Sequence, residues 1–117
     1  MSDNELRSTR VLALETSGLS GSVALLDAGR PLAELPLPVG QRSAQSLVPT
    51  IDALVRQLDW RLEQIGLVAV TSGPGSFTSL RIGVSTAKCL AYAWGAEIQG
   101  VSTLEVIARQ APLEHRR

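Results

Sequence analysis

The most informative segment of the chain reads Val68-Ala69-Val70-Thr71-Ser72-Gly73-Pro74-Gly75-Ser76-Phe77-Thr78-Ser79-Leu80-Arg81-Ile82-Gly83. It joins a short apolar run, a turn rich in glycine and proline, and the start of a helical pattern, with no spacer between them. This order predicts a buried strand that passes through a tight loop directly into a helix. The loop is therefore the first candidate for a functional site.

Two interpretations of this loop are open. Gly73 and Gly75 are able to adopt positive φ angles, and Pro74 between them fixes its own φ. Hydroxyl side chains follow and no acidic residue occupies the first turn of the helix, so an anion or a nucleotide could bind at the helix N-terminus. Alternatively, the hydroxyl groups cap the free amides themselves. The absence of a P-loop lysine and of a third glycine favours this second interpretation.

Length and composition limit the class of protein. With 117 residues, 44% of them apolar, and a formal net charge of zero, the chain is predicted to form one domain with an aliphatic core. The balanced charge argues against strong direct binding to nucleic acid, which needs a basic surface. Cys89 is the only cysteine and no apolar run reaches the length of a membrane span, which predicts a cytoplasmic protein with no membrane partner.

The pattern of apolar residues predicts a three-stranded meander followed by alternating helices and strands. The expected elements are strands at 11–14, 21–26 and 31–35, a helix at 43–58, a strand through Val70, a helix at 78–94, a strand at 97–101 and a helix at 103–110. Pro49 either sets the start of the first helix near Ser46 or kinks it. This order implies a mixed five-stranded sheet with helices packed on it, an α/β fold of the ribonuclease H-like or actin-like ATPase type.

The helix expected at 78–94 carries a stripe of small residues at steps of four: Ser79, Gly83, Ala87, Ala91 and, just beyond it, Gly95. Such a stripe lets another backbone approach closely. It lies either against the sheet of this domain or against a helix of another chain, and the sequence alone leaves both open.

Groups for catalysis are scarce. His115 is the only histidine, so we expect no histidine-pair metal site and no catalytic residue that depends on a histidine base. Cys89 is interpreted as a small packing residue within its helix. Glu15, at the end of the first strand, is the most interesting carboxylate, because open α/β sheets bind ligands at strand ends.

Several motifs resemble the N-terminal domain of the TsaB family, also called YeaZ. They are Leu12-Ala13-Leu14-Glu15-Thr16-Ser17, Ser22-Val23-Ala24-Leu25-Leu26, Leu47-Val48-Pro49-Thr50-Ile51-Asp52, the segment Gly73–Gly83, and Gly100-Val101-Ser102-Thr103-Leu104-Glu105. The segment Gly73–Gly83 carries the strongest part of the resemblance. The expected organisation is a flexible leader at 1–9, an actin-like N-terminal domain of TsaB type at 10–111 and a tail at 112–117. The family's usual second domain is absent, so the chain is expected to be a fragment or a shortened member.

The resemblance implies a non-catalytic scaffolding subunit in the synthesis of threonylcarbamoyladenosine, the modified base next to the anticodon of tRNA. In this family the subunit pairs with its paralogue TsaD, which transfers the threonylcarbamoyl group, and the pair recruits the ATPase TsaE. ATP and metal are accordingly expected on the partner subunits, and tRNA is contacted through the complex; a homodimer is a further expectation. The alternatives are a glycoprotease-like peptidase and a nucleotide-binding phosphotransferase of the actin-like fold.

Two sets of site residues are expected, and the resemblance implies the first of them. The family's dimer contact uses the first two helices, which assigns a partner interface to Leu47, Ile51, Leu54, Gly83, Ala87 and Ala91. A candidate nucleotide or anion loop comprises Glu15, Thr16, Ser17, Gly73, Gly75 and Ser76. Glu15 stands where the family usually has aspartate, which weakens the case for nucleotide binding, and Ser79 replaces the usual glycine.

Overall fold

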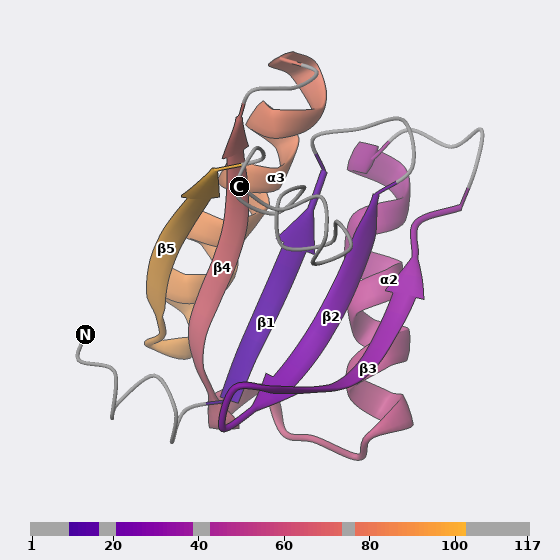
Figure 1. Ribbon diagram of the computed structural model, residues 1–117, viewed down its shortest axis with the longest axis vertical. Coiled ribbons are helices and arrows are strands. Elements are labelled where there is room, and N and C mark those ends of the chain that lie inside the picture. The colour runs from indigo at the N-terminus through magenta and orange to yellow at the C-terminus, as the bar shows by residue number, and fades with distance from the viewer. Residues whose placement is uncertain (1–9, 17–20, 39–42, 74–76, 103–117) are drawn as a thin grey trace, which may run out of the picture.

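The computed structural model of the chain describes residues 10–16, 21–38, 43–73 and 77–102. Its elements, in order, are β1 (Arg10–Glu15), β2 (Ser22–Asp27), β3 (Arg30–Pro36), α2 (Ser43–Gln57), a 3₁₀ turn η1 (Leu62–Gln64), β4 (Ile65–Gly73), α3 (Phe77–Trp94) and β5 (Glu97–Ser102). The strands form one sheet in the order β3-β2-β1-β4-β5 (Figure 1). The expected mixed five-stranded sheet is therefore confirmed.

The sheet has an antiparallel part and a parallel part. β2 pairs antiparallel with both β1 and β3, whereas β4 pairs parallel with both β1 and β5. Ala28 and Gly29 connect β2 to β3 with φ angles of 54° and 80°, the two positive values that a tight hairpin turn needs to follow the strand twist. Since β1, β4 and β5 are parallel, their carboxyl ends meet at the same end of the sheet.

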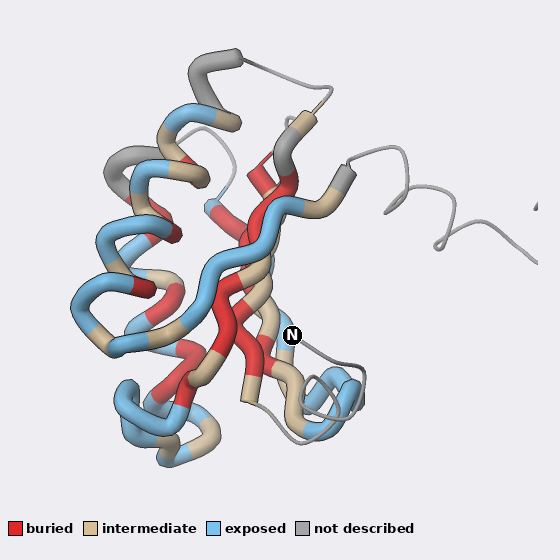
Figure 2. Tube along the Cα trace, turned by 90° about the vertical axis from the view of Figure 1, so that its left-hand side faces the viewer, coloured by how far each residue is buried: buried red, intermediate tan, exposed pale blue. Residues whose placement is uncertain are grey.

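Both helices cover the same face of the sheet (Figure 2). Leu12 and Leu14 of the central strand β1 point toward the helices and are at most 2% exposed, as period-two alternation requires. The helices complete this core with leucine, isoleucine and valine from α2 and with two alanines from α3. The small side chains of α3 allow it to lie close to β4, with which it makes its most extensive contact.

Pro49 lies inside α2, which begins at Ser43. A helix start near Ser46, one of the two alternatives, is therefore wrong. Proline removes one backbone hydrogen bond from the helix. Next to it, the Thr50 hydroxyl donates to the Ser46 carbonyl oxygen over 2.7 Å.

Most element boundaries were predictable to within one residue. The exceptions are β4, which continues to Gly73 because its end pairs with Ser102 of β5, and η1, which the sequence did not indicate. The leader 1–9, the helix at 103–110 and the tail 112–117 lie outside the described residues. Within the described ranges, neither helix is long and apolar enough to cross a membrane.

Candidate functional site

The carboxyl end of the parallel strands brings Thr16 and Thr71 together. Thr16 directly follows β1, and Thr71 lies near the end of β4, the neighbouring strand. The backbone N–H of Thr16 donates to the Thr71 hydroxyl oxygen over 3.3 Å, and the two residues are only 1% and 3% exposed. This hydrogen bond joins β1 and β4 just beyond the last residues that pair between them, Leu14 and Val70.

Helix α3 approaches the same point so closely that Gly83 touches Thr16. A Cβ atom at Gly83 would collide with the Thr16 hydroxyl and would lie 3.2 Å from its methyl carbon. The Thr16 Oγ1 atom is itself buried and has no hydrogen-bond partner among the residues that the structure describes. Because an unpaired buried hydroxyl costs roughly 1–3 kcal/mol, this group needs a reason for its presence. It marks this end of the sheet as the candidate site.

The structure places half of the candidate nucleotide or anion loop. Glu15, Thr16 and Gly73 lie at the carboxyl ends of β1 and β4, whereas Ser17, Gly75 and Ser76 fall outside the described residues. Gly73 has a φ angle of 115°, so the structure uses the conformational freedom that the sequence indicated.

Glu15 and Thr16 lie on different faces of the sheet, although the sequence grouped them in one loop. Successive side chains of a strand point to opposite faces, and Thr16 packs against α3. Glu15 instead lines a hollow of about 290 Å³, whose other lining residues are Ala13, Leu14, Ser22, Ala24, Glu34, Ala69, Val70, Thr71 and Val101. The strand register sets Ala24, Ala13 and Ala69 side by side. These small side chains create the hollow.

The residues assigned to a partner interface belong to the core of the domain itself. Every member of this set is buried. Apart from Gly83, which has no side chain to expose, none of them is more than 5% exposed: Leu47, Ile51, Leu54, Ala87 and Ala91. The members of this set on α2 and on α3 pack against the sheet and against each other. The structure therefore corrects this assignment: a partner would contact other residues of the two helices.

The exposed side of the helices carries residues that the sequence analysis missed. Tyr92 on α3 is 92% exposed and Val48 on α2 is 54% exposed. Tyr92 follows the exposed residues Ser85 and Lys88 at steps of three and four along α3. An aromatic residue within an otherwise polar stripe is the sequence signal from which an exposed tyrosine could have been predicted. Cys89 is also exposed, and its interpretation as a packing residue is therefore wrong.

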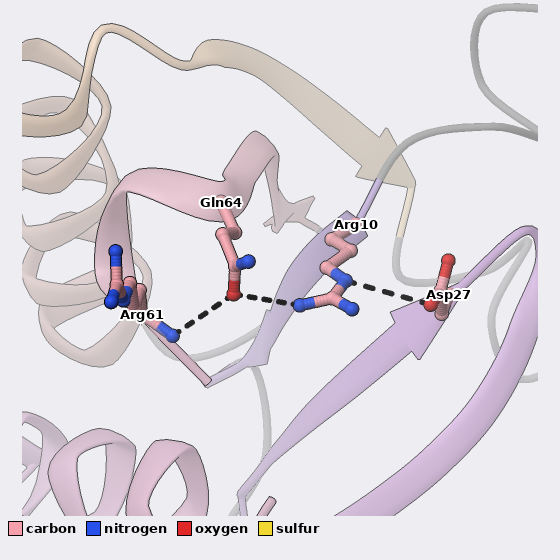
Figure 3. A network of polar contacts seen from close by, with 4 residues as sticks. All are labelled: Arg10, Asp27, Arg61 and Gln64. Carbon is pink, nitrogen blue, oxygen red and sulfur yellow. Dashed lines mark hydrogen bonds and ion pairs between the residues drawn. The ribbon is translucent and has the colours of Figure 1, made fainter. Parts of the chain in front are cut away.

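A polar network occupies the opposite end of β1 (Figure 3). Arg10 pairs with the Asp27 carboxylate over 3.5 Å and donates to the Gln64 side-chain oxygen over 2.8 Å. Its guanidinium carbon also lies 4.5 Å from the centre of the Trp60 ring, and Gln64 accepts a bond from the Arg61 backbone N–H. These contacts fasten η1 to the start of the sheet. In the part of the chain that the structure describes, no three His, Cys, Asp or Glu side chains are grouped as a metal site.

Comparison with known structures confirms the actin-like fold. A protein from Bacteroides thetaiotaomicron with an actin-like ATPase fold aligns with 89% of this chain and 38% of its own, with a TM-score of 0.56 at 9% identity. At that identity the likeness concerns the fold alone.

Closer matches come from two proteins of one family. TsaB of Bacillus subtilis, a tRNA threonylcarbamoyladenosine biosynthesis protein, is 33% identical over 98 residues, which cover 84% of this chain and 43% of that protein. YeaZ from Pseudomonas aeruginosa is 34% identical, with a TM-score of 0.81 over 88% of this chain and 48% of its own. The chain thus spans less than half the length of each of these two relatives.

A family model supports the same relationship. The model described as TsaD, tRNA N6-adenosine threonylcarbamoyltransferase, matches residues 35–117, which is more than half of the chain. The matched region includes both helices and the Gly73 loop. Together with the similarity to TsaB and YeaZ, this match shows that the chain belongs to the TsaB (YeaZ) family, within the wider family of threonylcarbamoyltransferases.

Proposed function

We propose that this chain is a scaffolding subunit in the synthesis of threonylcarbamoyladenosine in tRNA and that it pairs with a TsaD-type transferase. The observation that carries the proposal is the similarity to TsaB and YeaZ proteins over more than four-fifths of the chain. The B. subtilis relative is named for its part in this biosynthesis. The chain covers less than half of each relative. The activity and the partners of the complete protein are therefore part of what we propose.

The partner surface in this proposal is the outward side of α2 and α3. Both helices lie on one face of the sheet, and their buried stripes are already occupied by the core (Figure 2). Val48 on α2 and Tyr92 on α3 offer exposed apolar area outside these buried stripes. Tyrosine is enriched at protein interfaces, since its ring buries area while its hydroxyl keeps a polar contact. A related subunit with the same pair of helices is a suitable partner.

The chain is assigned an accessory role within that complex. Its sequence holds one histidine and one cysteine, which leaves few means to build a nucleophile and base pair. ATP and the metal ion are assigned to the partner subunits, a TsaE-type ATPase joins the complex, and tRNA binds through it. The cytoplasm is the expected compartment.

A second candidate function is nucleotide binding by this chain. It is favoured by the position of Glu15, Thr16 and Gly73 at the carboxyl ends of β1 and β4, where open α/β sheets bind ligands. Calorimetry with ATP tests it directly. Binding that Thr16→Val abolishes would support this function, and the absence of any binding heat would reject it.

Complex formation tests the leading proposal. The chain is mixed with a TsaD-type protein from the same organism and analysed by size exclusion with light scattering. We expect a one-to-one complex, and we expect Tyr92→Lys to weaken it at least about tenfold, because a tyrosine at an interface centre is a typical hot spot.

Leu32→Lys is the matched control for this variant. Leu32 lies on β3 and is also a large exposed hydrophobic residue, at 48% exposure, but it belongs to neither helix. The proposed surface would be contradicted if the folded chain did not bind the TsaD-type protein, or if the two variants weakened the complex equally.

A further inference from the structure

The two edge strands of the sheet, β3 and β5, are protected differently (Figure 1). β3 carries Pro31 and Pro36, which cannot donate a backbone hydrogen bond, and its pairing with β2 shifts register between Leu25 and Leu26. Prolines and register irregularities are the features by which edge strands avoid pairing with another chain. β3 is therefore a closed edge.

β5 has less of this protection. Its pairing with β4 also shifts register, but only near the end of the strand, between Thr71 and Gly73. It contains no proline, and Glu97 at its first position is its only charged residue. All residues from Glu97 to Gly100 are exposed, and Ile98 presents an apolar side chain that is 42% exposed. Among the strands that the structure describes, only β4 pairs with it. An edge of this kind is able to accept a further strand through main-chain hydrogen bonds.

We propose that β5 pairs in antiparallel orientation with β5 of a second copy of this chain, about a two-fold axis at Gln99. The sequence of the strand is self-complementary in this register. The Gln99 amides of the two copies face each other, Ile98 lies opposite Gly100, and Glu97 lies opposite Val101. No like charges meet, and the isoleucine covers the strand where glycine leaves space.

Neighbouring registers are less suitable. An axis at Ile98 would leave a ladder of only Glu97–Gln99, and an axis at Gly100 would set glycine opposite glycine with no side-chain contact at the centre. The Gln99 axis gives a longer ladder than the Ile98 axis, and it places matching side chains opposite each other, which the Gly100 axis does not do at its centre. It joins the two sheets into one continuous sheet.

This surface is separate from the one in the proposed function. β5 lies at the edge of the sheet, whereas the proposed TsaD-type partner contacts the outward side of α2 and α3. Pairing of two copies therefore leaves the helices available to the partner. The two proposals fail independently.

Crosslinking tests the register. In a Cys89→Ser background, Gln99→Cys sets two thiols directly opposite each other, where Cα atoms of an antiparallel pair lie about 4.5–5.5 Å apart and a disulfide fits. Glu97→Cys is the matched control, because its two copies would lie about 13 Å apart along the strands. We expect a covalent dimer on mild oxidation with Gln99→Cys alone. Crosslinking of both variants, or of neither, would overturn the proposal.

Light scattering over a range of concentrations tests the dimer without crosslinks. Two short strands bury little surface, so the range should extend to roughly millimolar chain. Gln99→Lys opposes two ammonium groups across the axis and should weaken the dimer at least about tenfold. Glu97→Lys adds the same charge opposite Val101 and should preserve the dimer, with circular dichroism confirming that both variants fold.

Three outcomes of this measurement would overturn the proposal. They are a chain that stays monomeric throughout the range, a dimer that Gln99→Lys leaves intact, and a dimer that Tyr92→Lys disrupts while Gln99→Lys does not. The last outcome would move the second copy to the helices.

Discussion

The two ends of β1 are held in different ways. At its amino end, Arg10 is stabilised by an ion pair with Asp27, a hydrogen bond to Gln64 and the face of Trp60, all in partly exposed surroundings. At its carboxyl end, Thr16 is almost fully buried between Thr71 and Gly83, and within the described ranges its hydroxyl has no hydrogen-bond partner. The amino end thus distributes its stability over several weak contacts, whereas the carboxyl end depends on one tight fit.

The largest effect is expected at the tight fit, from Gly83→Ala. The new Cβ would collide with the Thr16 side chain, and overpacking of this kind typically costs about 1–3 kcal/mol. The free energy of unfolding, measured by denaturant titration, should fall by that amount. Ser85→Ala, at an exposed position of the same helix, is the control and should change little.

A double mutant sharpens this prediction. Thr16→Ala removes the hydroxyl and the methyl group that the new Cβ would meet, so it should recover part of the stability lost in Gly83→Ala. Strictly additive effects of the two substitutions would show that Gly83 and Thr16 do not interact as described.

Thr71→Val should have an intermediate effect. It removes the acceptor of the Thr16 backbone N–H and leaves that buried donor unpaired, at a cost of about 1–2 kcal/mol in unfolding free energy. Thr50→Val is the matched control, because the Thr50 hydroxyl only donates to a carbonyl within its own helix. Equal losses in the two variants would argue against the role of the Thr71 hydroxyl.

The smallest effect is expected at the amino end, from Arg10→Ala. Its ion pair is partly exposed, and together with the ring contact it should contribute no more than about 1 kcal/mol. Thermal unfolding at low and high salt is the measurement, since high salt should reduce the ionic part of the loss. A loss larger than that of Gly83→Ala would reverse the comparison between the two ends.

Local patterns in the sequence account for the elements and their order. Alternation of apolar residues predicted the β-strands, and apolar spacing of three and four predicted α2. These signals depend only on which face of an element is buried. The same signals indicated the mixed sheet, because a meander followed by alternating helices and strands has few ways to pack.

The candidate site was less predictable, for physical reasons. A stripe of small residues such as Gly83, Ala87 and Ala91 packs equally well against a sheet or against another helix, and only the structure shows that it faces the core. Arg10 and Gln64 are 54 positions apart, so no local pattern connects them. The contact between Thr16 and Gly83 likewise depends on the distance between α3 and β1, which periodicity does not encode.

The comparison also bears on function. The tight carboxyl end holds β1 and β4 against α3, whereas the exposed side chains of the helices, such as Tyr92 and Val48, are available for a partner. In this account the fold supplies a rigid support and the exposed helix surface supplies the binding.

Reconstituted tRNA modification tests the central claim most directly. A TsaD-type transferase and a TsaE-type ATPase from the same organism are supplied with tRNA and the threonylcarbamoyl donor, with and without this chain, and threonylcarbamoyladenosine is quantified by mass spectrometry. The account predicts that modification falls sharply when the chain is omitted and that the Tyr92→Lys variant restores it only in part. Undiminished modification in the absence of the chain would contradict it.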